Sequence, residues 1–181
     1  MEQQLKELEI KPNKLAFQVA LGFSVYTLVL IFLFKLMEID TQDENMSAAT
    51  RIISSVLSYV PFVMAVMYVQ TKHRADLGGY MTFGRGFSAG FRVGANAGLF
   101  IGLLLVLYYK VLDPAALDHL IEVAIEKAGD NEKAIQGIKA TVPYMPVFIA
   151  FGGAITYTVF GLVVSLIGAA LFKKERPLDF N

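Results

Sequence analysis

The stretch GFSAGFRVGANAGLFIG, residues 86–102, has a glycine at every fourth position: Gly86, Gly90, Gly94, Gly98 and Gly102. Residues four apart lie above one another on one side of an α-helix, so this spacing predicts a row of bare backbone along a helix face. Inside a helix, glycine costs ~1 kcal/mol per residue relative to alanine. In a membrane, small residues can offset that cost because they let two helix backbones approach closely. The row therefore predicts a helix-packing groove of the kind called a glycine zipper.

The partner of this groove is expected in the same chain. Two other apolar stretches repeat the four-residue spacing with small side chains: Gly161, Ser165 and Ala169 in one, and Ala16, Ala20 and Ser24 in the other. A row spaced by four drifts ~40° per step around the helix axis, and a partner helix that crosses at about −40° would follow it. A homodimer through the same glycines is the main alternative, and a pore lined by bare backbone is the least favoured.

The composition around the row is that of a membrane protein. Of the 181 residues, 55% are hydrophobic and only 18% are charged, whereas about a quarter are charged in soluble domains. Four stretches of 20, 19, 17 and 33 residues carry no charge, at 15–34, 52–70, 93–109 and 140–172. A helix of about 20 residues, at ~1.5 Å per residue, crosses the hydrocarbon core of a bilayer. We therefore predict an all-α fold, an integral membrane four-helix bundle.

Length and prolines set the boundaries of the predicted spans. The first stretch exceeds the roughly 7–15 apolar residues of a signal peptide, so it is read as a retained span. The last stretch is too long for one straight span, and Pro143 and Pro146 place the beginning of its helix near Val147. The predicted spans are about 15–34, 52–70, 90–112 and 147–171, in a single domain at 15–172 between a leader at 1–14 and a tail at 173–181.

Residues 113–140 form a polar segment between the third and fourth spans. Asp113 and Pro114 predict the beginning of an amphipathic helix and Gly129 its end, with a second short helix at about 131–139. The acidic face of the first helix consists of Asp118, Glu122 and Glu126, with His119 beside it. Oxygen clusters suit divalent cations, but acidic stripes on exposed helices are far more often solvated. We expect an extramembrane helical segment without a metal.

Lysine and arginine are distributed unequally between the two sides of the predicted membrane. The segments 1–14, 71–92 and 173–181 together hold ten basic and six acidic residues, whereas 35–51 and 110–139 hold six basic and ten acidic ones. Positive charge close to span ends marks the cytoplasmic side. We therefore expect a multi-pass protein of a bacterial inner (cytoplasmic) membrane, with both termini in the cytoplasm.

Two positions within the spans stand out. Pro61 lacks an N–H group and predicts a kink near Leu57, where neighbouring serine hydroxyls can satisfy the freed carbonyls. Asn96 is expected to be a buried polar residue, and such residues are costly in a membrane and often mark function. A hydrogen bond across helices, with Gln18 as a candidate partner, is the favoured interpretation of Asn96.

Four basic residues gather at the predicted cytoplasmic face: Lys72, Arg74, Arg85 and Arg92. Arg85 and Arg92 share a polar stripe with Asn96, on the side of the helix roughly opposite the glycine row. The favoured interpretation is ordinary snorkelling combined with an orientation signal. The alternative is a pocket for the headgroup of an anionic lipid.

No catalytic constellation is recognisable. The chain has no cysteine, its two histidines are predicted on opposite sides of the membrane, and it contains no P-loop, zinc or serine-nucleophile motif. We expect a non-enzymatic protein with a structural or interaction role, without a cofactor or a nucleic-acid partner. Membrane lipids, another membrane protein or a second copy are the expected partners. The alternative function is a small channel or transporter with a path near Asn96 and Pro61.

A resemblance rests on two short motifs. The first is Gly78-Gly79-Tyr80-Met81-Thr82-Phe83-Gly84, followed by Phe87, Ala89-Gly90-Phe91 and small residues; the second is Leu107-Tyr108-Tyr109 with Asp113-Pro114. With these motifs the chain resembles the bacterial membrane family catalogued as domain of unknown function 4199, over residues 15 to about 174. The resemblance implies a four-span helical membrane protein and supplies no activity, so no functional residue follows from it.

Overall fold

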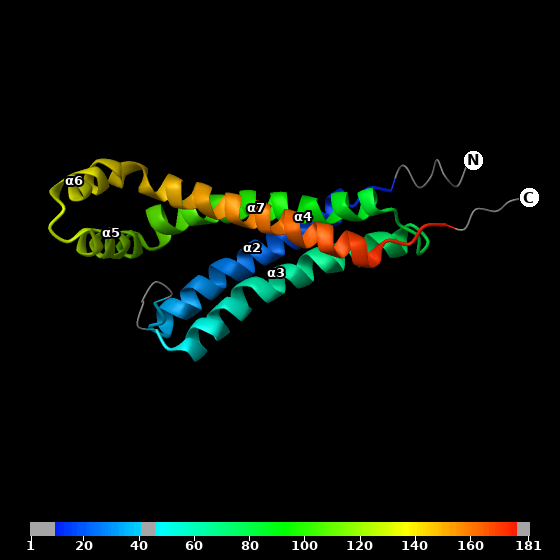
Figure 1. Cartoon of the computed structure of the whole chain (residues 1–181), viewed down its shortest axis with the longest axis horizontal. Helices are drawn as coiled ribbons and strands as arrows, with labels where there is room; N and C mark the ends of the chain where they lie inside the picture. The colour runs from blue at the N-terminus through cyan, green and yellow to red at the C-terminus, as the bar shows by residue number, and fades with distance from the viewer. Residues whose placement is uncertain (1–9, 41–45, 177–181) are drawn as a thin grey trace, which may run out of the picture.

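The computed structural model describes residues 10–40 and 46–176, so most of the predicted leader and part of the tail lie outside the described residues. Four long helices run side by side (Figure 1): α2 (Asn13–Leu36), α3 (Ala48–Asp76), α4 (Phe83–Leu107) and α7 (Met145–Phe172). By length and composition, all four can cross a membrane. The fold is all-α, as predicted.

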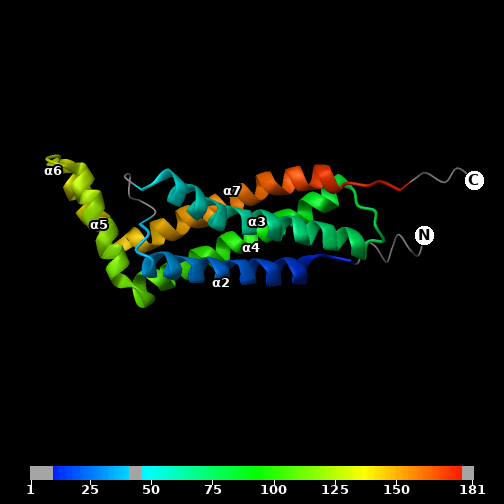
Figure 2. The same cartoon turned by 90° about the horizontal axis from the view of Figure 1, so that it is seen from below.

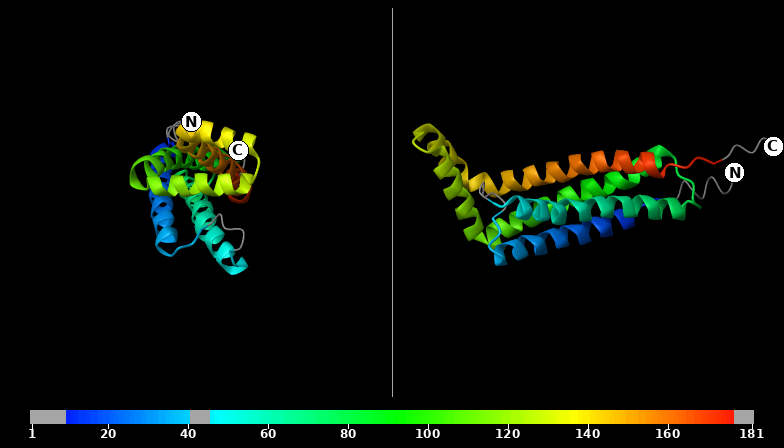
Figure 3. Two further views of the ribbon diagram at one scale, coloured as in Figure 1. Left: turned by 90° about the vertical axis from the view of Figure 1, so that its left-hand side faces the viewer. Right: turned by 60° about the horizontal axis from the view of Figure 1, so that its bottom comes forward.

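Two shorter helices, α5 (Pro114–Ala128) and α6 (Glu132–Thr141), form an arm at one end of the bundle. Figure 2 and the right-hand view of Figure 3 show this arm turning away from the long axis. The described chain begins and ends at the opposite end of the bundle. We call the two ends the arm end and the terminus end.

Local sequence explains where several helices begin and end. The Ser47 side chain caps α3 by accepting a hydrogen bond from the Thr50 amide, 3.1 Å away. Helix α3 ends where Gly78 and Gly79 adopt φ values of +76° and +89°, which favour glycine. A π-helical turn, Tyr108–Leu112, follows α4, and a 3₁₀ turn, Val142–Tyr144, precedes α7.

Helix α4 lies at the centre of the packing. It contacts α7 most extensively and then α2 and α3. The buried cluster takes apolar residues from all four long helices, with alanines only on α2 and α4: Ala16, Ala20, Phe23, Phe62, Val66, Val69, Ala89, Val93, Ala97, Ile101 and Val164. Large apolar side chains also cover the outside of the long helices, Met64, Leu103 and Phe151 among them. Such an exterior suits contact with lipid.

The long helices lie closer together at the terminus end than at the arm end. Figure 1 and the left-hand view of Figure 3 show α2 and α3 diverging from α4 and α7 toward the arm end. A cavity of about 430 Å³ lies there, lined by residues of all four long helices. At the terminus end, Met81 and Lys174 form an antiparallel bridge with two backbone hydrogen bonds of 2.8 Å, which ties the α3–α4 turn to the segment after α7.

Candidate functional site

The glycine row of α4 lies against α7, backbone to backbone. A Cβ atom built on Gly94 would stand 2.8 Å from Gly161 Cα, and one built on Gly161 would stand 2.5 Å from Gly94 Cα. Real Cβ atoms essentially never approach another atom closer than 3.0 Å. Neither position therefore accepts even alanine unless the two helices separate. We call this α4–α7 contact the glycine seam.

The seam extends over the whole row. Toward the terminus end, a Cβ on Gly90 would lie 2.7 Å from Ser165 Oγ, and one on Gly86 would lie 3.3 Å from Ala169 Cα. Toward the arm end, Gly98 faces Thr158 and the Ala154 carbonyl, and Gly102 faces the Ala150 carbonyl. The small residues predicted on the fourth span, Gly161, Ser165 and Ala169, thus meet Gly94, Gly90 and Gly86 in antiparallel order. Since α7 of the same chain covers the row, a homo-oligomer would have to use a different surface.

Pro61 is accommodated by a hydrogen bond from another helix. Proline has no N–H, so the carbonyl four residues earlier, that of Leu57, lacks its usual helical donor. The Tyr26 hydroxyl on α2 donates to this carbonyl at 2.9 Å. Two serines of α3 bond elsewhere: Ser55 Oγ donates to the Arg51 carbonyl and Ser58 Oγ to the Ser54 carbonyl, both at 2.8 Å. Ser54 Oγ has no partner among the described residues. The predicted partner was thus a serine, and the partner in the structure is a tyrosine.

Gln70 joins α3 to both helices of the seam. Its side chain is completely buried, and Nε2 donates to the Gly86 carbonyl at 3.0 Å and to the Ser165 carbonyl at 2.9 Å. The side chain fits because Gly168 has no Cβ, which would collide with Gln70 Oε1. Oε1 has no hydrogen-bond partner within the described chain. Gln70 therefore connects three of the four long helices near the terminus end.

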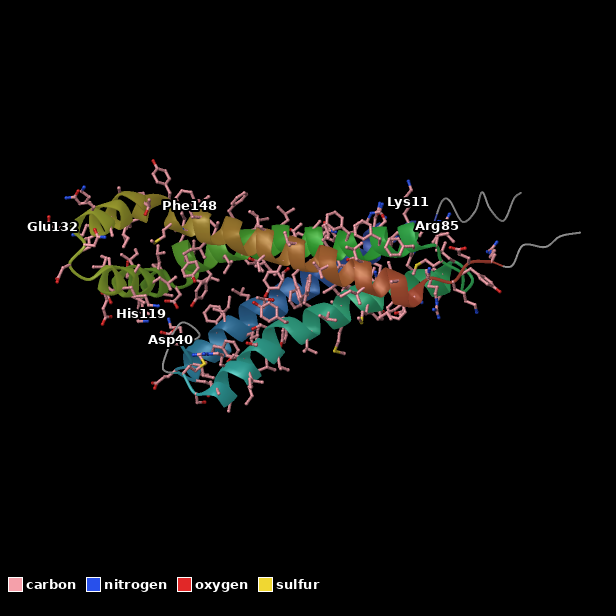
Figure 4. All side chains as sticks on the ribbon, viewed as in Figure 1. Lys11, Asp40, Arg85, His119, Glu132 and Phe148 are labelled. Atoms are coloured by element: carbon pink, nitrogen blue, oxygen red, sulfur yellow. The ribbon has the colours of Figure 1, made fainter. Side chains whose placement is uncertain are left out.

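The structure divides the predicted basic cluster into two parts. Arg85 and Arg92 line a pocket of about 200 Å³ at the terminus end, whereas Lys72 and Arg74 do not. Lys72 Nζ lies 3.6 Å from Asp76 Oδ1, and Arg74 Nη1 donates to the Phe172 carbonyl at 3.5 Å. The other residues that line this basic pocket are Ile10, Lys11, Pro12, His73, Gly84 and Ser88. Figure 4 shows the labelled Lys11 and Arg85 together at this end.

His73 is one of the residues that line the basic pocket. Only 3% of the residue is exposed, and its Nδ1 has no hydrogen-bond partner among the described residues. Gly84 contributes backbone to the wall, and nothing lies within 4 Å of the position where its Cβ would be. The pocket thus combines positively charged side chains, the accessible backbone of Gly84, and a histidine whose Nδ1 lacks a hydrogen-bond partner among the described residues.

A second polar cluster connects α2 to the beginning of the arm. Asp113 is 5% exposed; it pairs with Lys35 and accepts hydrogen bonds from the Tyr108 hydroxyl at 2.8 Å and from the Ala116 amide at 3.3 Å. The hydrogen bond from Lys35 is the main reason that the pKa of Asp113 is below its ordinary value, and burial partly opposes it. These residues border a cavity of about 480 Å³ that also includes His119, whose Nε2 lies 3.5 Å from Asp40 Oδ2 (Figure 4).

Asn96 differs from its expected environment. It is half-buried on α4, and its side chain makes no hydrogen bond to the described residues; Gln18 is exposed on α2. Among residues 10–40 and 46–176, the fully buried polar side chains are instead Gln70, Ser24 and Ser165. Among the acidic residues of α5, Asp118, Glu122 and Glu126 are all exposed.

The roles of four features were not predicted from the sequence pattern: Gln70, His73, Tyr26 and the Lys35–Asp113 pair. For Gln70 a signal existed, since it is the last residue of a charge-free stretch and a polar side chain there needs a partner. For Tyr26 and Lys35 no local signal exists, because their partners lie 31 and 78 positions away.

Together, the helices, the seam and the apolar exterior define an all-α protein with four candidate membrane-spanning helices. The chain belongs to the family described as "Protein of unknown function (DUF4199)", whose profile matches residues 18–174. This confirms the resemblance seen in the sequence. No curated protein and no solved structure matches the chain.

Proposed function

We propose that this chain is a non-enzymatic, multi-pass protein of the bacterial inner membrane, with cytoplasmic termini and a structural or interaction role. Its partners would be membrane lipids and a membrane protein or a second copy. The excess of lysine and arginine near the terminus end supports this orientation. The placement of both described chain ends at one end of the bundle agrees with four crossings.

The observation that carries a structural role is the contact between Gly94 and Gly161. Two helices whose backbones touch at several consecutive positions have one packing arrangement, since a shift along the axis would drive side chains into backbone. Alternating-access transporters, by contrast, work by moving one group of helices against another. A fixed α4–α7 pair suits a structural role, in which the protein holds other proteins or lipids in place. We call a protein with this role a frame protein.

The experiment compares two glycines of α7. Gly161→Ala introduces a methyl group into the seam, whereas Gly152→Ala introduces one where nothing lies within 4 Å. Gly161→Ala is expected to lower the free energy of unfolding by ~1–3 kcal/mol through overpacking. Gly152→Ala is expected to leave it unchanged or to raise it by up to ~1 kcal/mol through helix propensity. Unfolding in mixed micelles, followed by far-UV circular dichroism, measures both, and equal effects would contradict the proposal.

Gly78 is a poor control for this comparison, although it lies outside the seam. Its φ of +76° means that alanine there would strain the backbone irrespective of packing. Gly152 has neither a neighbour in contact nor an unusual φ, so it isolates the effect of the seam.

A small channel or carrier is the second candidate function, and the cavity of about 430 Å³ at the arm end favours it. The residues that line this cavity include the hydroxyl-bearing Thr27, Ser54 and Ser58. Asn96 is not among the lining residues. The path near Asn96 and Pro61 is therefore better placed at Ser54 and Ser58. Three aromatic rings pack against one another on three of the helices that line the cavity. They belong to Phe23 on α2, Phe62 on α3 and Tyr157 on α7, with centroids 5.0–5.6 Å apart.

Glycerol uptake by proteoliposomes, followed by light scattering, separates the two functions. If a path exists, Phe62→Ala should speed uptake by widening it, whereas Met64→Ala, on the exposed side of α3, should not. A frame protein gives the same rate as empty liposomes for the wild type and for both variants.

A further inference from the structure

The basic pocket offers a strong concentration of positive charge. Lys11, Arg85 and Arg92 line it, and no carboxylate is among the described residues of its wall. Asp76 lies outside this wall, where its Oδ1 is 3.6 Å from Lys72 Nζ. Three cationic side chains around a space of about 200 Å³ attract an anion, and they do so more strongly where apolar surroundings limit screening.

The first turn of α4 adds backbone donors to this charge. The first amides of a helix have no acceptor within the helix, and they carry the positive end of its dipole. The Thr82 side chain makes no capping hydrogen bond to them. Gly84 belongs to this turn and lines the pocket, and its missing side chain leaves the backbone accessible. Helix N-termini of this kind bind phosphate groups in many proteins.

His73 supplies an independent indication of a ligand. A buried polar atom without a partner costs free energy, so it normally has a protein, water or ligand partner. Nδ1 of His73 is such an atom, in a residue that is 3% exposed and lines the pocket. Ser88, one turn after Gly84 on the same wall, adds a hydroxyl that can donate to the same group.

From these observations we infer that the basic pocket binds a phosphate group, with Lys11, Arg85 and Arg92 as its charged contacts. The volume is below the ~300 Å³ typical of whole-ligand sites, so the pocket suits the phosphate of a larger molecule or a free phosphate ion. Its position at the end of the long helices is the level at which lipid headgroups lie. This inference goes beyond the proposed function, because the frame can exist without a bound phosphate.

The test is calorimetric titration of the purified full-length protein in a neutral detergent. One arm uses short-chain phosphatidic acid, a second uses inorganic phosphate, and a third uses short-chain phosphatidylcholine, whose choline group shields the phosphate. The wild type should bind phosphatidic acid saturably, with one site per chain, and phosphatidylcholine more weakly. Similar affinities for phosphatidic acid and inorganic phosphate would identify the free ion as a sufficient ligand. A clear preference for phosphatidic acid would identify a lipid headgroup.

The variants separate the pocket from general charge. Arg92→Gln and Lys11→Gln should each weaken binding by about tenfold or more, the factor that corresponds to ~1.4 kcal/mol. Lys72→Gln removes the same charge at the same end but outside the pocket, and should change affinity less than about twofold. Ser88→Ala keeps every charge and should weaken binding by a smaller factor, which preserves the test if an arginine variant fails to fold. The inference is overturned if neither phosphate compound binds saturably, or if Lys72→Gln weakens binding as much as Arg92→Gln does.

Discussion

The Leu57 carbonyl accepts a hydrogen bond from a different helix because Pro61, four residues later, has no N–H to donate. Pro61 removes the helical donor, and Tyr26 replaces it from α2 at 2.9 Å. An unsatisfied carbonyl at this depth would be costly, because neither lipid nor apolar side chains can donate to it. The same proline that disturbs α3 thereby creates a specific contact between α2 and α3.

A double-mutant cycle tests this dependence. Tyr26→Phe should lower the free energy of unfolding by ~0.6–1.5 kcal/mol in the wild type. In a Pro61→Ala background the Leu57 carbonyl regains an amide donor from residue 61, so the same Tyr26→Phe change should cost clearly less. Unfolding in mixed micelles measures all four proteins. Additive effects would mean that Tyr26 acts through packing alone.

Single residues also show what sequence reasoning can and cannot reach. Gly94 and Gly161 belong to rows with a regular spacing, and regular spacing on one helix predicts a complementary spacing on its partner. Gln70 follows no such rule, since its two acceptors lie 16 and 95 positions away. Gln70 reaches these acceptors only because α3 packs against the seam, and the spacing of residues in the sequence does not predict that packing.

At the level of elements, the apolar stretches indicated that each long helix exists but not where it ends. The second membrane span was predicted to end at about residue 70, and the helix that contains it, α3, continues to Asp76. Hydropathy marks the edge of the apolar region, but a helix continues until its backbone is broken, here at Gly78 and Gly79. The six additional helical residues include His73, which lines the basic pocket. The sequence did not predict His73 as a residue of this pocket.

The beginning of α5 was better specified, because capping depends on neighbouring residues. Asp113 and Pro114 predicted the boundary, and Asp113 Oδ1 accepts from the Ala116 amide. What the local pattern could not show is that the same carboxylate also binds Lys35 and Tyr108. The cap of the arm is thus also its attachment to α2 and to the end of α4.

This attachment should depend on pH. The pKa of Asp113 is lowered in the folded protein relative to 3.8, mainly by the hydrogen bond from Lys35. A lowered pKa stabilises the fold at pH values above the ordinary one, and the stabilisation disappears as pH falls through the folded-state pKa. At pH 7, Asp113→Asn should therefore reduce the free energy of unfolding by ~1–3 kcal/mol. The difference from the wild type should shrink progressively as pH falls below 3.8.

Asp118→Asn, an exposed position on the same helix, is the control for this prediction and should change stability by no more than ~0.5 kcal/mol. The measurement is unfolding in mixed micelles at several pH values from 7 down to 3. A difference between wild type and Asp113→Asn that stays constant over this range would show that the charge of Asp113 is unimportant.

In the whole molecule, one pair of long helices, α4 and α7, is packed much more closely than the other two. Helices α4 and α7 are joined along the glycine seam, whereas α2 and α3 pack against them closely at the terminus end and diverge at the arm end (Figure 1). Gln70 and the Met81–Lys174 bridge both lie near the terminus end and hold that end together. The cavities of about 430 and 480 Å³ lie at the other end. The larger cavities thus lie at the arm end, and the contacts that join α3 and the segment after α7 to α4 lie at the terminus end.

Because the basic pocket and the two larger cavities lie at opposite ends, the orientation in the membrane determines which compartment each of them faces. The chain has no cysteine, so single cysteines can be introduced at Ala75, exposed at the terminus end, and at Asp130, exposed in the arm. The lysine and arginine distribution predicts that a membrane-impermeant maleimide labels Asp130→Cys in intact spheroplasts and Ala75→Cys only after permeabilisation. The reverse labelling pattern would place the basic pocket outside the cytoplasm. The hydroxyl-lined cavity, at the opposite end, would then lie on the cytoplasmic side.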